Sequence, residues 1–150
     1  MKETIETGKC FCGTITAEIH GGPFWICFDH DDDCRRAIGS PLNVWIGVRP
    51  NQFQLTKGTP KTFLKTKGVV RTFCSDCGTS ISYLDEGLPD ELYITIGFLD
   101  HPESFTPQAH AYWSHKLPWI EFADKLPHIE KYSRKRDLSV GNPEDREDES

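Results

Sequence analysis

The sequence predicts an all-β fold of small antiparallel sheets with one short helix. Three stretches alternate apolar and polar residues, as half-buried strands do: residues 14–20 ("TITAEIH"), 42–48 ("LNVWIGV") and 91–99 ("ELYITIGFL"). Turn-forming sequences such as "GGP", "RPN", "KGTP" and "DEGLPD" separate the apolar segments at intervals of roughly ten residues. Together these observations favour a sandwich, a barrel or a related pair of sheets.

The faces of the expected strands follow from their alternation. Residues two apart on a strand point to the same face, so each strand should bury one set of apolar side chains. The expected inward sets are Ile15, Ala17 and Ile19; Val44, Ile46 and Val48; and Leu92, Ile94 and Ile96. Weaker strand signals occur in residues 24–28, 52–58, 61–66, 69–73, 79–84 and 109–114.

The one helix signal is "DDDCRRAIG", residues 31–39. An aspartate can cap the start of a helix, and further acidic residues favour the positive end of its dipole. Gly39 can end the helix in the left-handed conformation that glycine tolerates. The stretch therefore predicts one or two helical turns.

Length and charge suggest one folded domain with an acidic end. A chain of 150 residues fits one domain, predicted at residues 1–135, followed by a disordered acidic tail at 136–150. Four of the six net negative charges lie in "EDREDES", and the acidic balance argues against a nucleic-acid partner. No apolar stretch has the length of a signal peptide or membrane span, so we expect a cytoplasmic protein without a membrane partner. Nothing in the sequence predicts an oligomeric state.

Four of the six cysteines form two pairs, each followed by glycine. Cys10 and Cys12 lie in "GKCFCGT", and Cys74 and Cys77 lie in "FCSDCGT". Residues two apart on an extended segment can present both sulfurs to one ion, and a CxxC turn does the same. Two such pairs predict a closed four-thiolate site, which structural zinc prefers, although iron also fits four sulfurs. Metal binding is favoured over disulfides in a cytosolic chain.

The cysteine pairs occur in a fixed order with other motifs: "GKCFCGTITAEI", "CRRAIGSP", "RTFCSDCGTSI", "GFLDHPESFTPQAH" and "PWIEFADKLP". Together they resemble the glutathione-dependent formaldehyde-activating enzyme family, which also includes centromere protein V, over roughly residues 6–128. The resemblance implies a zinc-stabilised β-tent fold and a structural zinc on the four cysteines above. It also implies carbon–sulfur bond formation or cleavage on the adduct of glutathione with formaldehyde.

The resemblance further implies a second zinc site just before the arginine pair. Family members typically hold this ion with the three cysteines of a "CHCxxC" motif. Aligned on "CRR", the three cysteines fall on Asp29, Asp31 and Cys34, with His30 between the two aspartates. Two of the three family ligands are therefore aspartates in this chain. This difference from the family pattern lies in the residues on which the activity would depend.

Three interpretations of this substituted site stay open. In the first, Asp29, Asp31 and Cys34 hold a metal with an open fourth position, as in catalytic zinc sites, and harder ions compete with zinc. In the second, the ligand set is shifted, and Cys27 or His30 replaces a lost sulfur. In the third, no metal binds, and the aspartates cap the short helix or pair with the arginines.

Basic residues near the site are candidates for substrate binding. Arg35 and Arg36 can hold a carboxylate through bidentate hydrogen bonds, and Arg71 in "VVRTF" is a similar candidate. The alternative is a structural role, because one of two adjacent arginines is more often a salt-bridge partner. His110 in "PQAH" matches a family position and is a candidate to face the second site, with a core histidine as the more common alternative.

Two hypotheses of function follow. In the first, the chain is a zinc-dependent carbon–sulfur lyase that acts on the thiol adduct of a small aldehyde. Cys34, Asp29 and Asp31 then form the catalytic site, and Arg35 or Arg36 binds the substrate. In the second, the chain is a non-catalytic, zinc-stabilised β module with a degenerate second metal site, and it binds a small ligand or a protein.

Overall fold

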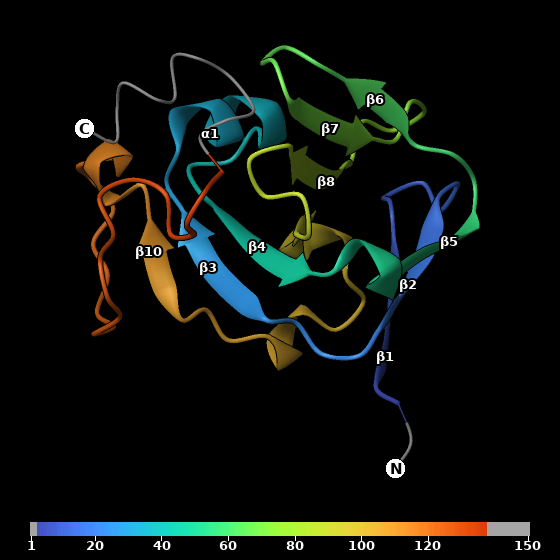
Figure 1. The fold of residues 1–150 in the computed structure, drawn as a ribbon, viewed down its shortest axis with the longest axis horizontal. Helices are drawn as coiled ribbons and strands as arrows, with labels where there is room; N and C mark the ends of the chain where they lie inside the picture. Colours follow the sequence, from blue (N-terminus) through green and yellow to red (C-terminus); the bar gives the residue numbers. More distant parts are fainter. Residues whose placement is uncertain (1–2, 138–150) are drawn as a thin grey trace.

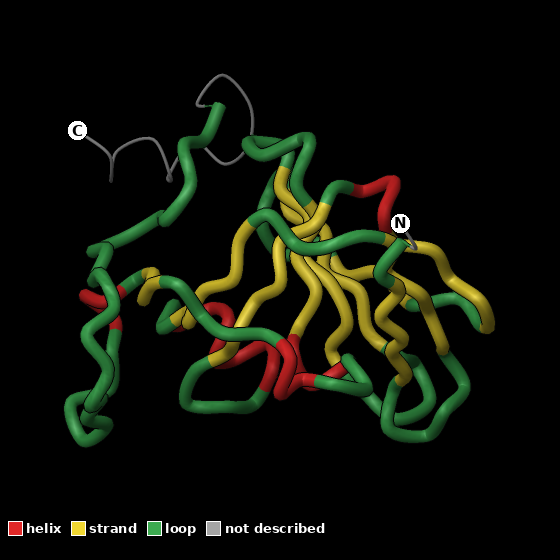
Figure 2. Tube along the Cα trace, turned by 90° about the horizontal axis from the view of Figure 1, so that it is seen from below, coloured by secondary structure: helices red, strands yellow, loops and turns green. Residues whose placement is uncertain are grey.

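The computed structural model describes residues 3–137, which form two β-sheets and one α-helix (Figure 1). The smaller sheet has the strand order β1-β2-β5, and the larger has the order β10-β3-β4-β9-β8-β7-β6. Seen after a 90° turn, the strands lie next to each other in the middle of the molecule, with the loops around them (Figure 2). The prediction of a mostly β fold with one short helix is confirmed, and the tent shape implied by the resemblance stays a prediction.

The strands of the small sheet are β1 (Ile5–Lys9), β2 (Thr16–His20) and β5 (Phe53–Lys57). The large sheet contains β10 (Ala109–Ala111), β3 (Trp25–Asp29), β4 (Asn43–Val48), β9 (Leu92–Thr95), β8 (Ser80–Asp85), β7 (Val69–Phe73) and β6 (Lys61–Phe63). The 3-10 helices are Pro50–Gln52, Ile96–Phe98, Pro102–Ser104 and Trp113–His115. Every strand pair named here is antiparallel except β10 with β3, which is parallel.

The predicted inward faces mostly form the core. Ile15, Ala17 and Ile19 are buried around β2, as their alternation requires. Strand β4 lies between β3 and β9, and it buries side chains on both faces, Trp45 as well as Ile46. The third predicted strand is shorter than expected, because the chain leaves β9 after Thr95 and continues as a 3-10 helix.

Helix α1 (Asp32–Ile38) follows β3 directly and ends as predicted. Gly39 has a φ of 75°, and its N–H donates to the Arg35 carbonyl at 2.8 Å. The predicted aspartate cap is wrong, because Asp31 occupies the N-cap position without a side-chain hydrogen bond to the helix. Its carboxylate lines a pocket instead, and Cys34 is the buried residue of the helix.

The C-terminal end of the described region is joined to the domain. Arg136 and Asp85 form a buried ion pair, with side chains 2% and 1% exposed and a shortest distance of 2.7 Å. Most of the predicted tail, from residue 138 to residue 150, lies outside the described residues. The predicted boundary between domain and tail at residue 135 stays a prediction. No helix in residues 3–137 has the length and apolar character needed to cross a membrane.

Candidate metal centre and active-site pocket

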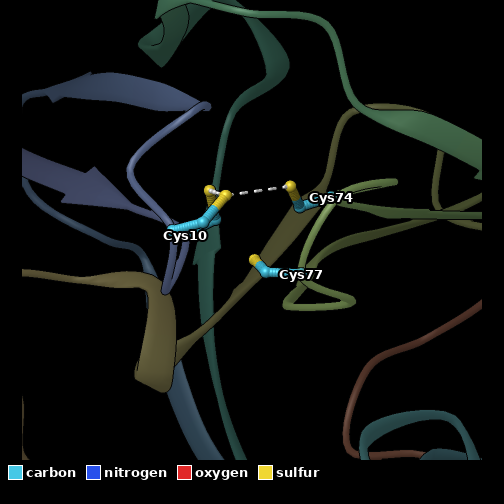
Figure 3. Close-up of side chains that lie close together, drawn as sticks. Cys10, Cys74 and Cys77 are labelled. Carbon is cyan, nitrogen blue, oxygen red and sulfur yellow. Dashed lines mark hydrogen bonds between the residues drawn. The ribbon is translucent and has the colours of Figure 1, made fainter.

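The four paired cysteines gather at one point between the two sheets. The Sγ atoms of Cys10, Cys12, Cys74 and Cys77 all lie within 4.8 Å of one another. Two of the separations are 3.6 Å, from Cys10 to Cys12, and 3.8 Å, from Cys12 to Cys74. A tetrahedral ion about 2.3 Å from each sulfur separates the sulfurs by about 3.8 Å. In Figure 3, Cys10 comes from one side and Cys74 and Cys77 from the other, so the geometry fits a single metal ion.

Local backbone geometry explains why each cysteine pair is followed by glycine. Gly13 and Gly78 have φ values of 77° and 78°, in the left-handed region that glycine adopts without strain. The N–H of Gly13 donates to the carbonyl of Cys10 at 3.0 Å, and that of Gly78 donates to the carbonyl of Cys74 at 2.8 Å. Each glycine thus closes a tight turn that holds its cysteines around the cluster.

Hydrogen bonds favour the thiolate at Cys77 and Cys10. At Cys74 the N–H of Cys77 lowers the pKa of the thiol, but burial and the sulfurs of Cys77 and Cys10 raise it to about 11. The Thr79 hydroxyl, 3.2 Å from Cys77 Sγ, acts with backbone N–H groups to lower the pKa of the Cys77 thiol to about 5. At Cys10, burial opposes ionisation, but the Ile15 N–H at 3.3 Å and the neighbouring sulfurs bring the pKa below its ordinary value. Thiolate is the form of cysteine that binds a metal, so these donors suit the same role.

A cavity of about 240 Å³ lies beside helix α1. Predicted site residues Asp29, Asp31, Cys34 and Cys27 line it. Other lining residues come from helix α1, the large sheet, the connection between β8 and β9, the chain after β10 and the C-terminal end of the described region. They include Asp32, Asp33, Trp45, Arg71, Tyr83, Leu88, Tyr93, Tyr112, His115, Tyr132, Ser133 and Arg134. The structure therefore brings the three predicted catalytic residues to one pocket with aromatic walls.

The two aspartates of the predicted site have different environments. Asp29 is buried, and its two oxygens accept from the Asp31 N–H at 2.9 Å and from Trp45 Nε1 at 2.8 Å. Burial raises the pKa of Asp29. Burial first, and then the charge of Asp29, raise the pKa of Asp31 to about 6. The pKa of Asp31 therefore lies nearer to neutral pH than that of an ordinary aspartate.

The cysteine of the predicted site is a protonated thiol in this environment. Cys34 is 4% exposed, and burial followed by the negative charge of Asp29 raises its pKa well above the ordinary value. Arg71 Nη2 donates toward Cys34 Sγ at 3.6 Å and works in the opposite direction. The guanidinium thus marks a place in the pocket where negative charge on sulfur is stabilised.

A different set of groups shows the closest arrangement of possible oxygen and nitrogen ligands. Within residues 3–137, the groups of three or more ligand atoms mutually within 4.8 Å are the four cysteines and the set Asp31, Asp32 and His115. His115 Nδ1 lies 3.5 Å from a carboxylate oxygen of each aspartate. The predicted ligands Asp29, Asp31 and Cys34 share the pocket wall but do not form such a compact group.

His30 lies away from the pocket, on the other side of β3. Its Nε2 is 2.9 Å from His110 Nδ1, and His110 Nε2 is 3.0 Å from a carboxylate oxygen of Asp124. Both histidines are fully buried, and burial lowers the pKa of His30 to about 4. The family position His110 is therefore a core residue here, and the link to Asp124 had no signal in the sequence.

The arginines that follow Cys34 do not line the pocket. Arg35 Nη1 donates to the carbonyl of His115 at 2.7 Å and also to that of His30, so it ties the helix to the chain after β10. Arg36 is exposed. The pocket arginines are Arg71, which was a candidate from the sequence, and Arg134, which was not because it lies about a hundred residues from the motif.

Comparisons with known proteins agree with this geometry. A family model described as "Glutathione-dependent formaldehyde-activating enzyme" matches residues 5–115. A crystal structure of a Rhodobacter sphaeroides protein from a structural genomics programme aligns with a TM-score of 0.51 and 15% identity. The alignment covers 82% of this chain and 99% of that one, and at this identity it shows a shared fold. No curated protein matches the chain.

Proposed function

Since the chain belongs to the glutathione-dependent formaldehyde-activating enzyme family, we propose that its pocket forms or breaks the carbon–sulfur bond between a thiol and a small aldehyde. The observation that carries the proposal is a carboxyl of near-neutral pKa, a thiol and a guanidinium on the wall of one small cavity. The reaction class is that of a carbon–sulfur lyase. We assign the reaction to the cytoplasm and its substrate to the small-molecule thiol adducts.

The metal in this proposal is one zinc ion held by Cys10, Cys12, Cys74 and Cys77. Four thiolates close the coordination sphere of zinc, so such an ion supplies folding energy and leaves no position for substrate. It would join the turn after β1 to the turn after β7. The chemistry is then assigned to side chains of the pocket.

Asp31 is the proton carrier of the proposed reaction. In the direction of bond formation, its carboxylate takes the proton of the substrate thiol, and the sulfur attacks the carbonyl carbon. The carbonyl π electrons move to oxygen, which receives a proton from the Asp31 carboxylic acid, and the product is the hydroxyalkyl thioether. Cleavage follows the same steps in reverse. A carboxyl with a pKa of about 6 exchanges protons effectively near neutral pH.

Neighbouring groups hold the reacting atoms. Arg71, beside Cys34 Sγ, provides positive charge where the substrate sulfur is transiently a thiolate. Asp29 fixes the backbone of Asp31 through its 2.9 Å hydrogen bond. The Cys34 thiol, which has one S–H to donate, lies beside both aspartates and lowers their pKa values relative to burial alone.

Whether Asp29, Asp31 and Cys34 also bind a second metal ion is a separate question from this mechanism. The acidic wall of the pocket favours a cation, but Trp45 and the Asp31 N–H already occupy the oxygens of Asp29, and a guanidinium already faces Cys34. We therefore expect about one metal ion per chain, unchanged in Cys34→Ser, by elemental analysis of protein purified without added metal. About two ions in the wild type, falling to one in Cys34→Ser, would establish the second site.

The activity test measures turnover of a thiol–formaldehyde adduct by the wild type, Asp31→Asn and Asp33→Asn. Loss of a proton carrier costs about 10²- to 10⁴-fold in rate, and we expect this loss for Asp31→Asn. Asp33 belongs to the same wall but pairs with the exposed Lys65 at 3.2 Å, so Asp33→Asn should retain most activity. Equal turnover by Asp31→Asn and the wild type would contradict the mechanism.

The alternative function, a non-catalytic zinc-stabilised module, rests on the same substitutions. Two family ligands of the second site are aspartates, and one of them, Asp29, is engaged within the protein. Such a module would bind small thiol adducts in the pocket without turning them over. Saturable quenching of tryptophan fluorescence by an adduct, with no turnover in the wild type, would favour this alternative, since Trp45 lines the pocket.

A further inference from the structure

The wall of the pocket that faces solvent includes a C-terminal segment, residues 132–137, here named the C-terminal strap. Three of its residues, Tyr132, Ser133 and Arg134, line the cavity. The family model ends at residue 115, so the strap lies outside the matched part of the chain. Figure 1 shows the last described residues, in red, next to β3 and α1.

The first half of the strap is attached to β3. Trp25 Nε1 donates to Ser133 Oγ at 3.0 Å, and Ser133 lies 4.0 Å from Cys27 Sγ. Just before the strap, the N–H of Tyr112 donates to the carbonyl of Lys131 at 2.9 Å. These contacts fix one end of the strap against the strands that carry Asp29 and the residues after β10.

The second half is attached to the connection between β8 and β9. Arg134 Nε lies 2.6 Å from Glu91 Oε1, and Arg136 Nη2 lies 2.8 and 2.7 Å from the two oxygens of Asp85. The N–H of Asp137 donates to the carbonyl of Gly87 at 2.7 Å. Because its two halves are held on opposite sides, the strap bridges the pocket.

The strap leaves a small space. The cavity of about 240 Å³ is below the range of roughly 300–1,000 Å³ that is usual for sites that enclose a drug-sized ligand. A tripeptide such as glutathione is therefore too large to lie wholly inside the cavity while the strap is in place. A short thiol adduct is small enough for such a volume, whose lining includes Asp31 and Arg71.

We propose that the C-terminal strap determines specificity by closing the pocket to thiol adducts of tripeptide size and admitting those of small thiols. That the ligands are thiol adducts rests on the function proposed above. The exclusion of large molecules does not depend on turnover, because the strap should keep any large reagent away from Cys34. Loosening the strap should then admit larger molecules without altering the groups that carry protons.

Two substitutions loosen the strap from different sides. A Cβ at Gly87 would lie 3.0–3.2 Å from three atoms of the Arg136 guanidinium, so Gly87→Ala pushes that side chain from its position. Glu91→Gln removes the charge that Arg134 meets at 2.6 Å. Gly97→Ala is the matched control, because a Cβ at the exposed Gly97 meets nothing within 4 Å.

The experiment compares modification of Cys34 by N-ethylmaleimide and by a maleimide with a long biotin linker, using site-resolved mass spectrometry. Both reagents react with thiols through the same maleimide group. The ratio of their rates at Cys34, divided by the ratio of their rates with free N-acetylcysteine, therefore reports only how well each reagent reaches Cys34. We expect the wild type to disfavour the large reagent by about tenfold or more, and Gly87→Ala and Glu91→Gln to recover about that factor. Gly97→Ala should behave as the wild type does.

Two results would overturn the proposal. The first is a wild-type ratio equal to that of N-acetylcysteine, and the second is an unchanged ratio in the folded loosened variants. Unfolding midpoints in urea establish which variants are folded, and Glu91→Gln decides alone if Gly87→Ala does not fold. Modification of Cys34 needs no turnover, so the proposal about the strap can be tested even on a protein without lyase activity. If the protein is active and its pocket admits the large reagent, the proposal about the strap is refuted and the proposed function is not.

Discussion

Removal of the ion from the four-cysteine cluster is expected to cost this chain much of its stability. Cys12 and Cys74 are 62 residues apart in sequence, and an ion between them closes a loop of that length in the unfolded chain. In the chain-entropy model, a cross-link over such a loop is worth about 4 kcal/mol. Structural zinc binding in small domains amounts to about 10–16 kcal/mol, and whole domains are stable by only about 5–15 kcal/mol. Loss of the ion should therefore leave the fold marginal or unfolded.

Urea unfolding, followed by the fluorescence of the four tryptophans, of which Trp45 is buried, measures this cost. The comparison includes the wild type, the wild type treated with a strong chelator, and Cys77→Ser with its metal content determined. Cys27→Ala is the control, because Cys27 is buried but lies outside the cluster, and it should lose about 1–2 kcal/mol and no metal. If chelation and Cys77→Ser both leave the unfolding midpoint unchanged, the reasoning about the cluster is wrong.

Three further predictions concern charges in the fold. The folded-state pKa of Asp31 is raised from 3.8 to about 6, so its ionised form is disfavoured by folding, and stability falls as pH rises between these values. Asp31→Asn should therefore gain about 1–3 kcal/mol at pH 7 and progressively less toward pH 4 in urea unfolding; an equal gain at both pH values would contradict this. Asp85→Asn leaves Arg136 buried opposite a neutral partner and should lose about 3–5 kcal/mol. Asp33→Asn, which opens the exposed pair with Lys65, should change stability by less than about 1 kcal/mol.

Local patterns in the sequence predicted most of the secondary structure. Alternation placed Ile15, Ala17 and Ile19 on one buried face, and the end of α1 followed from Gly39. Strand β1 and the 3-10 turn after Thr95 had no comparable signal. A strand of five residues with mostly exposed side chains lacks alternation, and its pairing with β2 is what defines it.

The four-cysteine cluster could be predicted because its geometry is local within each pair. The pocket could be predicted only in part, because its other walls are brought in by pairings distant in sequence. Arg71 reaches Cys34 across 37 residues, and Ser133 reaches the indole of Trp25 across 108. Spacing within a motif says nothing of such contacts, so the strap and the distinct roles of Arg35 and Arg71 emerged only from the structure.

The aspartates in place of the family's cysteines have separate consequences in this fold. The carboxylate at position 29 accepts from Trp45 and from the backbone, and it has become part of the support of the site. The carboxylate at position 31 faces the pocket and has a pKa of about 6. A thiolate pair at these positions would serve a metal, whereas one engaged and one titratable carboxylate serve proton transfer. Under the function proposed above, the substitutions therefore favour acid–base catalysis, which predicts that turnover depends on Asp31 and survives removal of any metal outside the four-cysteine cluster.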